Sequence, residues 1–407
     1  MNRLSTNETA RRLGVKPATV YAYVSRGLLH PKRGADDRSS TFDPTEVEQL
    51  AARGRAATSS QTGARPLAIA SALTLIEDGR FWYRGEDALH LAQERSFEEV
   101  ATWLWSGSFE VGLPWTSPSA VVVPAIEAQE GFGRAETVLP VDRIRLIVAI
   151  ASALDPLRYD LGPEAVVDRA RRLIATMVEA LPRRGQQRGI EMSIAERLWP
   201  RLTSEPPDPS KLHALNAALV LLADHELPAS TVAVRLAAST GAHLYAVVSA
   251  GLGVIDGPKH GGASLAAEAL LAEVAVKDGG AQAVVSERLR RGERIPGFGQ
   301  PLYPDGDPRA GLLLELTEAA VGEEALRHAR DVISVMEDAG RPQRNIDFAL
   351  AAFARATGMQ RGAGELLFSV ARTAGWIAHA LEEYAAGTWY RARARYVGPR
   401  PRPMPGR

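Results

Sequence analysis

Apolar and polar positions follow a helical period along most of the chain. Between Val141 and Val276, apolar residues recur at the spacing of amphipathic helices. Two segments of this region, Leu146–Ile150 and Leu215–Leu222, are apolar enough to be buried. The longest apolar stretch, around Ala242–Ile255, is shorter than the ~20 residues that a membrane-spanning helix needs. The pattern therefore predicts a mainly α-helical protein without a membrane span.

A short β-hairpin is expected ahead of these helices. The segment Leu73–Gly85 contains Asp78-Gly79, a pair that favours a tight hairpin turn. Ser96 follows as the expected N-cap of a helix, with Glu99 at the capping-box position. We expect these residues to build the fold rather than to take part in chemistry.

The beginning of the chain has a different pattern, with two short helices joined by a tight turn. Ser5 is the expected N-cap of the first helix, Glu8 is its capping-box partner, and Gly14 ends the helix. Pro17 opens the second helix, because its missing N–H costs nothing at that position, and Gly27 ends it. The polar segment Pro31–Asp43 is expected to form a β wing, and Asp43-Pro44 opens a third helix. This order is typical of a helix-turn-helix.

Composition and charge narrow the class of protein. The chain has 407 residues, of which 45% are hydrophobic and 24% are charged, as in globular proteins of two or three domains. The formal net charge is zero, so the whole molecule has no bulk attraction to nucleic acid. The absence of cysteine excludes disulfides, thiol catalysis and thiolate metal sites. The N-terminus has no apolar signal core, and we expect a cytoplasmic protein.

A change in composition marks the expected domain boundary. Residues 56–66 are rich in Ser, Thr, Gly, Ala and Arg, which is typical of a linker. The predicted organisation is therefore a small helix-turn-helix domain at 1–55, the linker, and a large helical domain at 67–400. Residues 1–60 contain ten Lys or Arg and six Asp or Glu, a local charge of +4 in a chain of zero net charge.

Two turn-rich stretches carry polar side chains between helices. The first, 257–264, reads GPKHGGAS and places His260 before two glycines and a helix. The second, 297–309, reads GFGQPLYPDGDPR and ends with Arg309 at the start of another helix. Glycine lets a ligand or backbone approach closely, but a lone His-Gly-Gly is more often a turn than a site.

Three further positions place ionisable groups in or beside apolar helices. His225 lies in a run of three ionisable residues after the buried segment 215–222, where unpaired charge is costly. Asp347 opens an apolar helix and is either an N-cap carboxylate or a site residue. Arg372 lies at the centre of the apolar helix 366–380, where its fork suits a carboxylate.

Taken together, these stretches resemble the citrate synthase family. The family blocks GPxHGGA, GFGHxxYxxxDPR, HADHExxAST, PNVDFY and FAVARTAGWIAH find counterparts in the family order over roughly residues 66–400. The resemblance implies a nearly all-α subunit of two parts that forms a homodimer. It also implies condensation of acetyl-CoA with oxaloacetate to give citrate and CoA, with acetyl-CoA as co-substrate and neither a permanent cofactor nor a metal.

The resemblance also assigns roles to individual residues. Asp347 would be the base, and His260 would donate a hydrogen bond to the thioester oxygen. The residues that would hold oxaloacetate are His225, Arg309, Arg372 and, from the second subunit, Arg391. Gln300 stands where the family has a histidine that polarises the ketone of oxaloacetate. Because an amide can donate a hydrogen bond but cannot become cationic, we expect weaker polarisation and a slower reaction.

The N-terminal pattern resembles the MerR-type winged helix-turn-helix. The DNA contacts that this implies come from Lys16, Thr19, Tyr21 and Arg26, on and beside the second helix. The alternative is a helical hairpin used only for packing or for contact with a partner. Two other functions stay open for the whole chain. One is 2-methylcitrate synthesis from propionyl-CoA, and the other is a DNA-binding regulator that uses the synthase pocket to sense a metabolite.

Overall fold

The computed structural model describes two compact parts of the chain. The described residues are 4–13, 15, 17–25, 29–33, 40–44, 46–47, 69–109, 115–132, 138–186, 193–257, 260–387, 389–391, 394 and 397–398. The two units are Met1–Ala70 and Ser71–Arg407, called here the N-terminal unit and the C-terminal unit. Among the described helices, none is long and apolar enough to cross a membrane.

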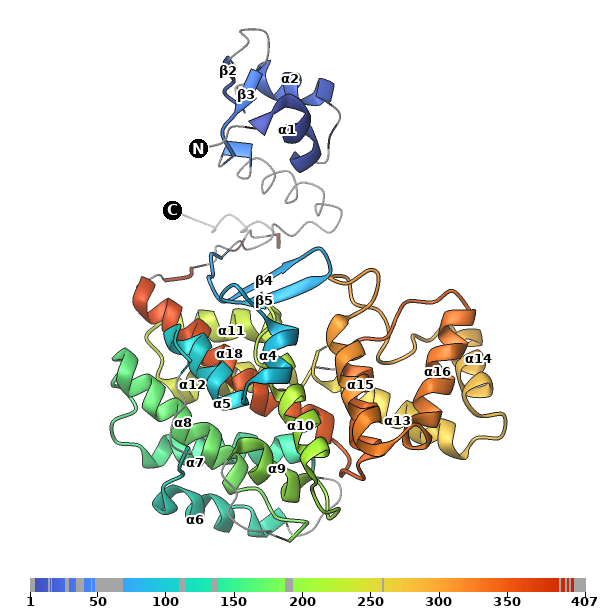
Figure 1. Ribbon diagram of the computed structural model, residues 1–407. Coiled ribbons are helices and arrows are strands. Elements are labelled where there is room, and N and C mark those ends of the chain that lie inside the picture. Colours follow the sequence, from blue (N-terminus) through green and yellow to red (C-terminus); the bar gives the residue numbers. More distant parts are fainter. Residues whose placement is uncertain are drawn as a thin grey trace, which may run out of the picture. The chain divides into compact units, whose positions relative to one another are not determined.

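The N-terminal unit packs two helices against a small antiparallel sheet (Figure 1). Its elements are β1 (Leu4–Ser5), α1 (Thr6–Leu13), α2 (Pro17–Ser25), β2 (Lys32–Arg33) and β3 (Ser40–Phe42). The strand order is β1-β3-β2, so the expected β wing is confirmed. The buried apolar residues of its core are Ala10, Val20, Leu29, Phe42 and Val47.

Local capping explains where its first helix begins. The Glu8 N–H donates to Ser5 Oγ at 3.3 Å, and the Ser5 N–H donates to Glu8 Oε2 at 2.8 Å, which confirms the capping box. Pro17 is the first residue of α2, as expected. In the expected third helix, the Val47 N–H donates to the Asp43 carbonyl at 3.0 Å. The predicted helix ends at Gly14 and Gly27 and the linker 56–66 lie outside the described residues.

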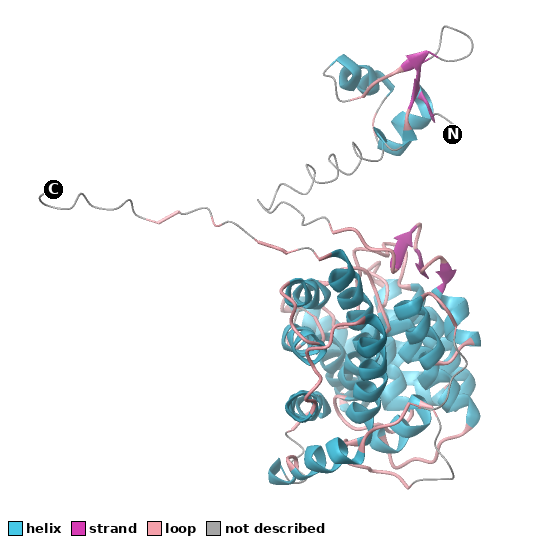
Figure 2. Ribbon diagram, turned by 90° about the vertical axis from the view of Figure 1, so that its left-hand side faces the viewer, coloured by secondary structure: helices cyan, strands magenta, loops and turns pink. Residues whose placement is uncertain are grey.

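A three-stranded hairpin sheet opens the C-terminal unit (Figure 2). Its strands are β4 (Thr74–Glu77), β5 (Arg80–Tyr83) and β6 (Glu86–Asp87). The φ angles of Asp78 and Gly79 are +50° and +73°, as a type I′ turn requires, so the expected hairpin is confirmed. The Tyr83 hydroxyl lies 3.0 Å from the Val220 carbonyl oxygen and 2.9 Å from that of Asp224. These contacts dock the sheet on the end of a buried helix.

Helices fill the rest of this unit and form a large and a small lobe, each with its own hydrophobic core (Figure 1). The large lobe contains α4 (Ala88–Glu94), α5 (Phe97–Ser106), α6 (Ser119–Glu127), η2 (Glu130–Phe132), α7 (Pro140–Leu154), α8 (Pro163–Glu179), α9 (Ile194–Leu202), α10 (Pro209–Leu222), α11 (Ala229–Ser239), α12 (Leu244–Ile255) and α18 (Ala363–Ala386). The small lobe contains α13 (Gly262–Val276), α14 (Gly280–Arg290), η3 (Glu324–Leu326) and α16 (Arg327–Asp338). The mainly α-helical fold class is therefore confirmed.

Two helices, α15 (Pro308–Val321) and α17 (Ile346–Ala356), lie between the lobes and pack against both cores. The face of α17 in the small-lobe core consists of Phe348, Ala351 and Ala352. Its face in the large-lobe core consists of Ile346, Ala349, Leu350, Phe353 and Ala354. Since α17 is apolar on both faces, its polar N-terminus lies where the two lobes meet.

Candidate active site

Asp347 occupies the first turn of α17. Asn345, not Asp347, is the N-cap: its side chain accepts from the N–H groups of Asp347 and Phe348 at 3.1 and 3.4 Å. The alternative that Asp347 only caps the helix is therefore wrong. Burial raises the pKa of Asp347 to about 7, against the opposing influence of Arg309. A carboxylate with such a pKa can take up a proton near neutral pH.

Arg309 is buried at the start of α15, beside a carboxylate two residues earlier. Its Nε and Nη2 donate to the two oxygens of Asp307 at 2.9 and 2.8 Å. Burial lowers the pKa of Arg309, but the Asp307 carboxylate outweighs this and raises it above its usual value. Asp307 Oδ2 also accepts from the N–H of Ile346 at 3.1 Å. The pair therefore ties α15 to the beginning of α17, directly beside Asp347.

Arg372 is buried in the middle of α18 and faces a turn of the large lobe. Its Nε donates to the Leu222 carbonyl at 2.8 Å, and its guanidinium carbon lies 4.7 Å from the centre of the Phe368 ring. Among the described residues, none accepts a hydrogen bond from its two terminal nitrogens. A buried guanidinium with spare donors is suited to an anionic ligand.

The close approach of α18 to this turn requires a glycine. The Gly375 N–H donates to the Ala223 carbonyl at 3.0 Å, and an added Cβ would lie 2.3 Å from the same oxygen. No larger residue fits without moving the helix away from the turn. Gly375 therefore brings Arg372 and the 222–225 turn together.

His225 lies in that turn and is nearly fully buried. Its Nε2 is 2.8 Å from the Tyr303 hydroxyl, and Tyr303 in turn packs against the Arg309 guanidinium at 5.7 Å. Burial, together with Arg309 and Arg372, holds the pKa of His225 well below its usual value. The following residue, Glu226, has φ +55°, a strained conformation that is frequent at functional sites.

His260 stands just before α13, with its ring against the large lobe. Its Nε2 lies 2.7 Å from Ser230 Oγ, and its ring centre is 6.0 Å from that of Phe368. Burial and the charge of Arg372 lower the pKa of His260 to about 4. The imidazole is therefore neutral at ordinary pH and has one N–H to donate.

The structure gathers most, but not all, of the predicted site residues. Besides burial, the charges of Arg309 and Arg372 lower the pKa values of both Asp347 and His225, and the charge of Arg372 lowers that of His260. Gln300 is partly buried, and its side-chain oxygen accepts from the Leu302 N–H at 3.5 Å rather than from another site residue. Arg391 is exposed beyond α18, with its guanidinium 6.0 Å from the Trp389 ring.

Sequence reasoning missed several residues of this site. Ser230 lies in the segment Leu222–Thr231 that matches the family block HADHExxAST, but the sequence did not indicate which residue it contacts. Tyr303 and Asp307 were likewise part of a matched block, yet their contacts with His225 and Arg309 depend on how distant segments pack. The sequence marks these three residues only as polar side chains within the matched blocks. It does not show which side chain each of them contacts.

The predicted DNA-contact residues are only partly described. Tyr21 has 57% of its surface exposed on α2, whereas Thr19 is partly buried on the same helix. Lys16 and Arg26 lie outside the described residues. Of the two predicted DNA contacts that the structure describes, Tyr21 is thus the more exposed.

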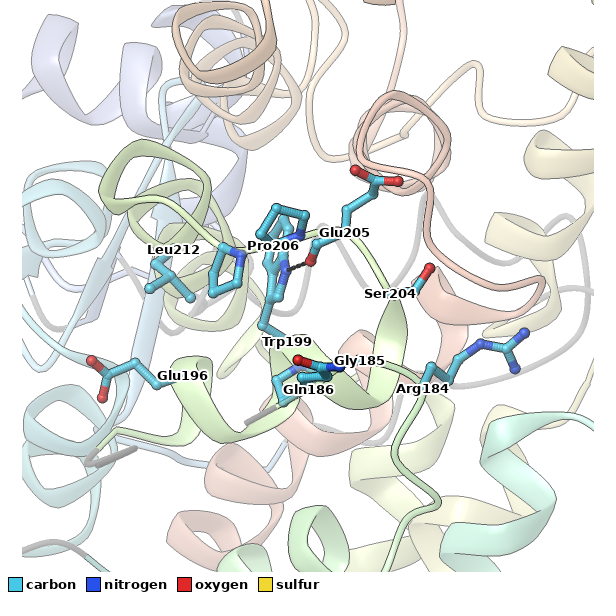
Figure 3. Close-up of a pocket in the computed structure, with 11 residues that line it drawn as sticks. Arg184, Gly185, Gln186, Glu196, Trp199, Ser204, Glu205, Pro206 and Leu212 are labelled. Atoms are coloured by element: carbon cyan, nitrogen blue, oxygen red, sulfur yellow. Dashed lines mark hydrogen bonds between the residues drawn. The ribbon is translucent and has the colours of Figure 1, made fainter. Parts of the chain in front are cut away.

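A pocket of about 470 Å³ lies elsewhere in the large lobe (Figure 3). Trp199 of α9 forms one wall, and its indole N–H donates to the Glu205 carbonyl at 2.8 Å. The other lining residues are Arg184, Gly185, Gln186, Glu196, Pro200, Ser204, Pro206, Pro207 and Leu212. None of these belongs to the cluster around Asp347, so the buried ionisable cluster, and not this pocket, is the candidate active site.

Fold and site define a two-lobed helical enzyme of the citrate synthase type, with a base candidate and buried arginines where its lobes meet. The model of the citrate synthase C-terminal domain matches residues 64–393, and the chain belongs to the citrate synthase family. Residues 4–53 match the model of the MerR HTH family regulatory proteins.

Individual relatives agree with this assignment. Citrate synthase 2 of Bacillus subtilis is 30% identical over 82% of this chain and 94% of its own length. A 2-methylcitrate synthase of Shewanella oneidensis is 28% identical over 79% of this chain and 89% of its own. The fold is similar to that of Thermoplasma acidophilum citrate synthase, solved as a ternary complex with carboxymethyl coenzyme A and oxaloacetate. The TM-score is 0.68, with 22% identity over 85% of this chain and 97% of that one.

Proposed function

We propose that this protein condenses acetyl-CoA with oxaloacetate and releases citrate and CoA. The observation that carries the proposal is the coupling of Asp347, whose pKa is about 7, to Arg372, whose terminal nitrogens have no described acceptor. This reaction needs a base and guanidinium N–H donors that can bind a substrate carboxylate. The complex of the Thermoplasma acidophilum enzyme with oxaloacetate and a CoA analogue supports the same choice of substrates.

Asp347 acts as the base in this proposal. The methyl group beside a thioester is a weak acid, so the carboxylate must accept its proton while charge develops elsewhere. As the C–H bond breaks, its electron pair moves into the thioester and charge collects on the carbonyl oxygen. With a pKa near 7, Asp347 is a stronger base than an ordinary carboxylate and is still about half ionised at neutral pH.

His260 stabilises that developing charge. When the Ser230 hydroxyl donates to Nε2, the proton of the neutral ring is on Nδ1, which is then the donor to the thioester oxygen. A fixed neutral donor of this kind stabilises an enolate without a prior proton transfer. Ser230 thereby selects the tautomer that the reaction uses.

The arginines hold oxaloacetate for attack. Arg309 already donates twice to Asp307, so Arg372 is the stronger candidate for a substrate carboxylate. His225, Arg309 and Arg391 of a second copy complete the set that we propose. The enolate carbon attacks the ketone carbon and forms the new C–C bond, while the π pair of the ketone moves onto its oxygen, to which the Gln300 amide donates a hydrogen bond. The resulting alkoxide takes up a proton from solvent, and Asp347 returns its proton to solvent. Water then hydrolyses the citryl thioester and frees CoA.

A thiol-release assay tests the proposal directly. The chain has no cysteine, so the protein contributes no background to a thiol reagent. We expect CoA release from acetyl-CoA that requires oxaloacetate, together with citrate as the product by mass spectrometry. Release without oxaloacetate, or no release at all, would contradict the condensation.

The acyl chain is tested in the same assay. The relative from Shewanella oneidensis favours propionyl-CoA as a second candidate substrate, with 2-methylcitrate as product. We propose acetyl-CoA as the preferred substrate, so kcat/KM should be higher for it than for propionyl-CoA. The opposite order would assign this chain to 2-methylcitrate synthesis.

DNA binding is a second candidate function, favoured by the MerR match and by the helix and wing elements of the N-terminal unit. Helix-turn-helix modules read bases from their second helix and are positioned by phosphate contacts. We propose that full-length protein binds a palindromic site upstream of its own gene. Binding that weakens as salt rises and is lost in a deletion of residues 1–60 would support it. The regulator hypothesis fails if the two proteins bind that DNA equally.

A further inference from the structure

A buried ionic cluster lies behind the candidate active site, at the C-terminal end of α18. Its centre is Arg235 of α11, which is 3% exposed. The Nε of Arg235 donates to Glu383 at 2.5 Å, and one terminal nitrogen donates to Glu382 at 2.6 Å. The same nitrogen lies 2.8 Å from Nδ1 of His379. A buried guanidinium so fully surrounded fixes the end of α18 on α11.

This cluster touches the turn that carries His225. His379 Nε2 lies 3.3 Å from the Asp224 carboxylate, which is fully buried. Asp224 Oδ2 also accepts from the Thr74 hydroxyl at 2.5 Å. Burial would raise the pKa of Asp224, but the facing His379 holds it below its usual value, so a charge-assisted contact links the cluster to the site.

The cluster also holds the tail of the chain. The last helix ends at Ala386, and Gly387 with φ +59° is its left-handed C-cap. The Tyr390 hydroxyl then donates to Glu383 Oε1 at 2.7 Å, the same oxygen that accepts from Arg235. Tyr390 is thus hydrogen-bonded to a buried side chain that Arg235 also binds, and Arg391 follows Tyr390 directly.

We propose that Tyr390 is a positioning residue, which sets the direction of the tail so that Arg391 reaches the active site of a second copy of this chain. Arg391 is exposed and makes no described contact with the site of its own chain, which fits a role in a partner. An exposed arginine gains affinity for a carboxylate when its backbone is held in place before binding. This inference rests on the proposed oxaloacetate-binding role of Arg391.

The test is Tyr390→Phe, which removes the hydroxyl and keeps the ring. Its matched control is Tyr384→Phe in the last turns of α18, where the hydroxyl donates to the Ala242 carbonyl at 2.6 Å rather than to Glu383. For full-length protein, we expect Tyr390→Phe to raise the oxaloacetate KM and the calorimetric Kd about fivefold, as for a loss of roughly 1 kcal/mol. The KM for acetyl-CoA and the thermal midpoint should match the control. Equal effects in both variants would overturn the proposal.

A double-mutant cycle asks whether Tyr390 acts through Arg391. Arg391→Ala alone should weaken oxaloacetate binding more than Tyr390→Phe, and adding Tyr390→Phe to it should have no further effect. Additive effects would overturn the positioning role. If Arg391→Ala leaves binding unchanged, the role of Arg391 in the proposed function fails and the inference falls with it. A normal Arg391 effect beside an unaffected Tyr390→Phe overturns the inference alone.

Mixed dimers separate a contact within one chain from a contact between copies. Chains carrying Tyr390→Phe are co-expressed with an excess of differently tagged Asp347→Asn chains, and the mixed dimers are purified through both tags. Their active site has an intact Asp347 on the Tyr390→Phe chain and takes Arg391 from the Asp347→Asn chain. We expect a wild-type oxaloacetate KM. A KM as high as in the Tyr390→Phe homodimer would contradict delivery between copies.

Discussion

The two units of this protein place their candidate functional residues in opposite surroundings. In the N-terminal unit, the described core is apolar, and Tyr21 is exposed on the surface of α2. In the C-terminal unit, Arg309 and Arg372 are buried, Arg309 against the Asp307 carboxylate and Arg372 against the Leu222 carbonyl. A buried charge persists only where its neighbours compensate it, whereas an exposed residue has no such requirement. The internal packing therefore constrains the role of the arginines and leaves the role of Tyr21 open.

The largest difference between the two units is expected from Asp347→Asn, which should affect condensation and not DNA binding. The substitution keeps the shape of the side chain and removes its basicity, so turnover should fall by at least ~10²-fold. Oxaloacetate binding, measured by calorimetry, and DNA binding should both remain, because neither uses the base. An Asn variant with near wild-type turnover would show that Asp347 is not the base.

The pH dependence sharpens the same assignment. Since the Asp347 carboxylate must be ionised to act, kcat/KM should fall roughly tenfold per unit as pH drops below about 7. The stability of the fold changes with pH in the opposite direction. The pKa of Asp347 is higher in the folded state than in the unfolded chain, so protonation of Asp347 stabilises the fold. This contribution is full below pH 3.8 and is lost as pH rises through about 7.

The matched measurement is the free energy of unfolding of wild type and Asp347→Asn across this range. As pH rises, the free energy of unfolding of the Asn variant should increase relative to that of wild type, by at most about 4 kcal/mol. A difference in stability that does not change with pH would contradict the raised pKa, whatever the kinetics show.

Gln300→His tests a position that the structure leaves outside the contacts of the cluster. If the amide polarises the ketone weakly, the histidine should raise turnover with oxaloacetate by about tenfold, part of the 10²–10³-fold that one such donor can contribute. Gln300→Ala is the control, and its turnover should fall. A slower His variant that still binds oxaloacetate would mean that the pocket is adapted to glutamine.

The smallest effect on condensation is expected from removing residues 1–60. The Ala72 N–H is held by Glu382 at 2.8 Å, so the C-terminal unit keeps its own first anchor after the deletion. Turnover should change by less than about twofold, since separate domains usually fold on their own. The same deletion should abolish specific DNA binding. A large loss of turnover would show that the two units depend on each other.

Local signals were sufficient for several elements. The type I′ turn at Asp78-Gly79 and the capping box of Ser96 and Glu99 are set by residues close in sequence, and both are confirmed. The matched family blocks likewise identified Asp347 and Arg372 as candidates before any geometry was known. Short-range rules and matched blocks thus located the elements and the main ionisable groups.

What sequence could not supply are properties created by distant packing. The pKa of Asp347 depends on burial between two cores, and the partner of His260 is Ser230, 30 residues earlier. The need for glycine at 375 arises from a backbone that approaches from the 222–225 turn. Each of these depends on atoms that meet only in the folded chain.

The position of α17 in two cores has a mechanical consequence. A helix that is packed on both sides cannot follow one lobe without sliding against the other, and such sliding is small in shear motions of packed helices. A rotation of the small lobe would therefore change the spacing between Asp347 and Arg372 by a limited amount. The packing of α17 thus limits how far a movement of one lobe could displace Asp347 from Arg372.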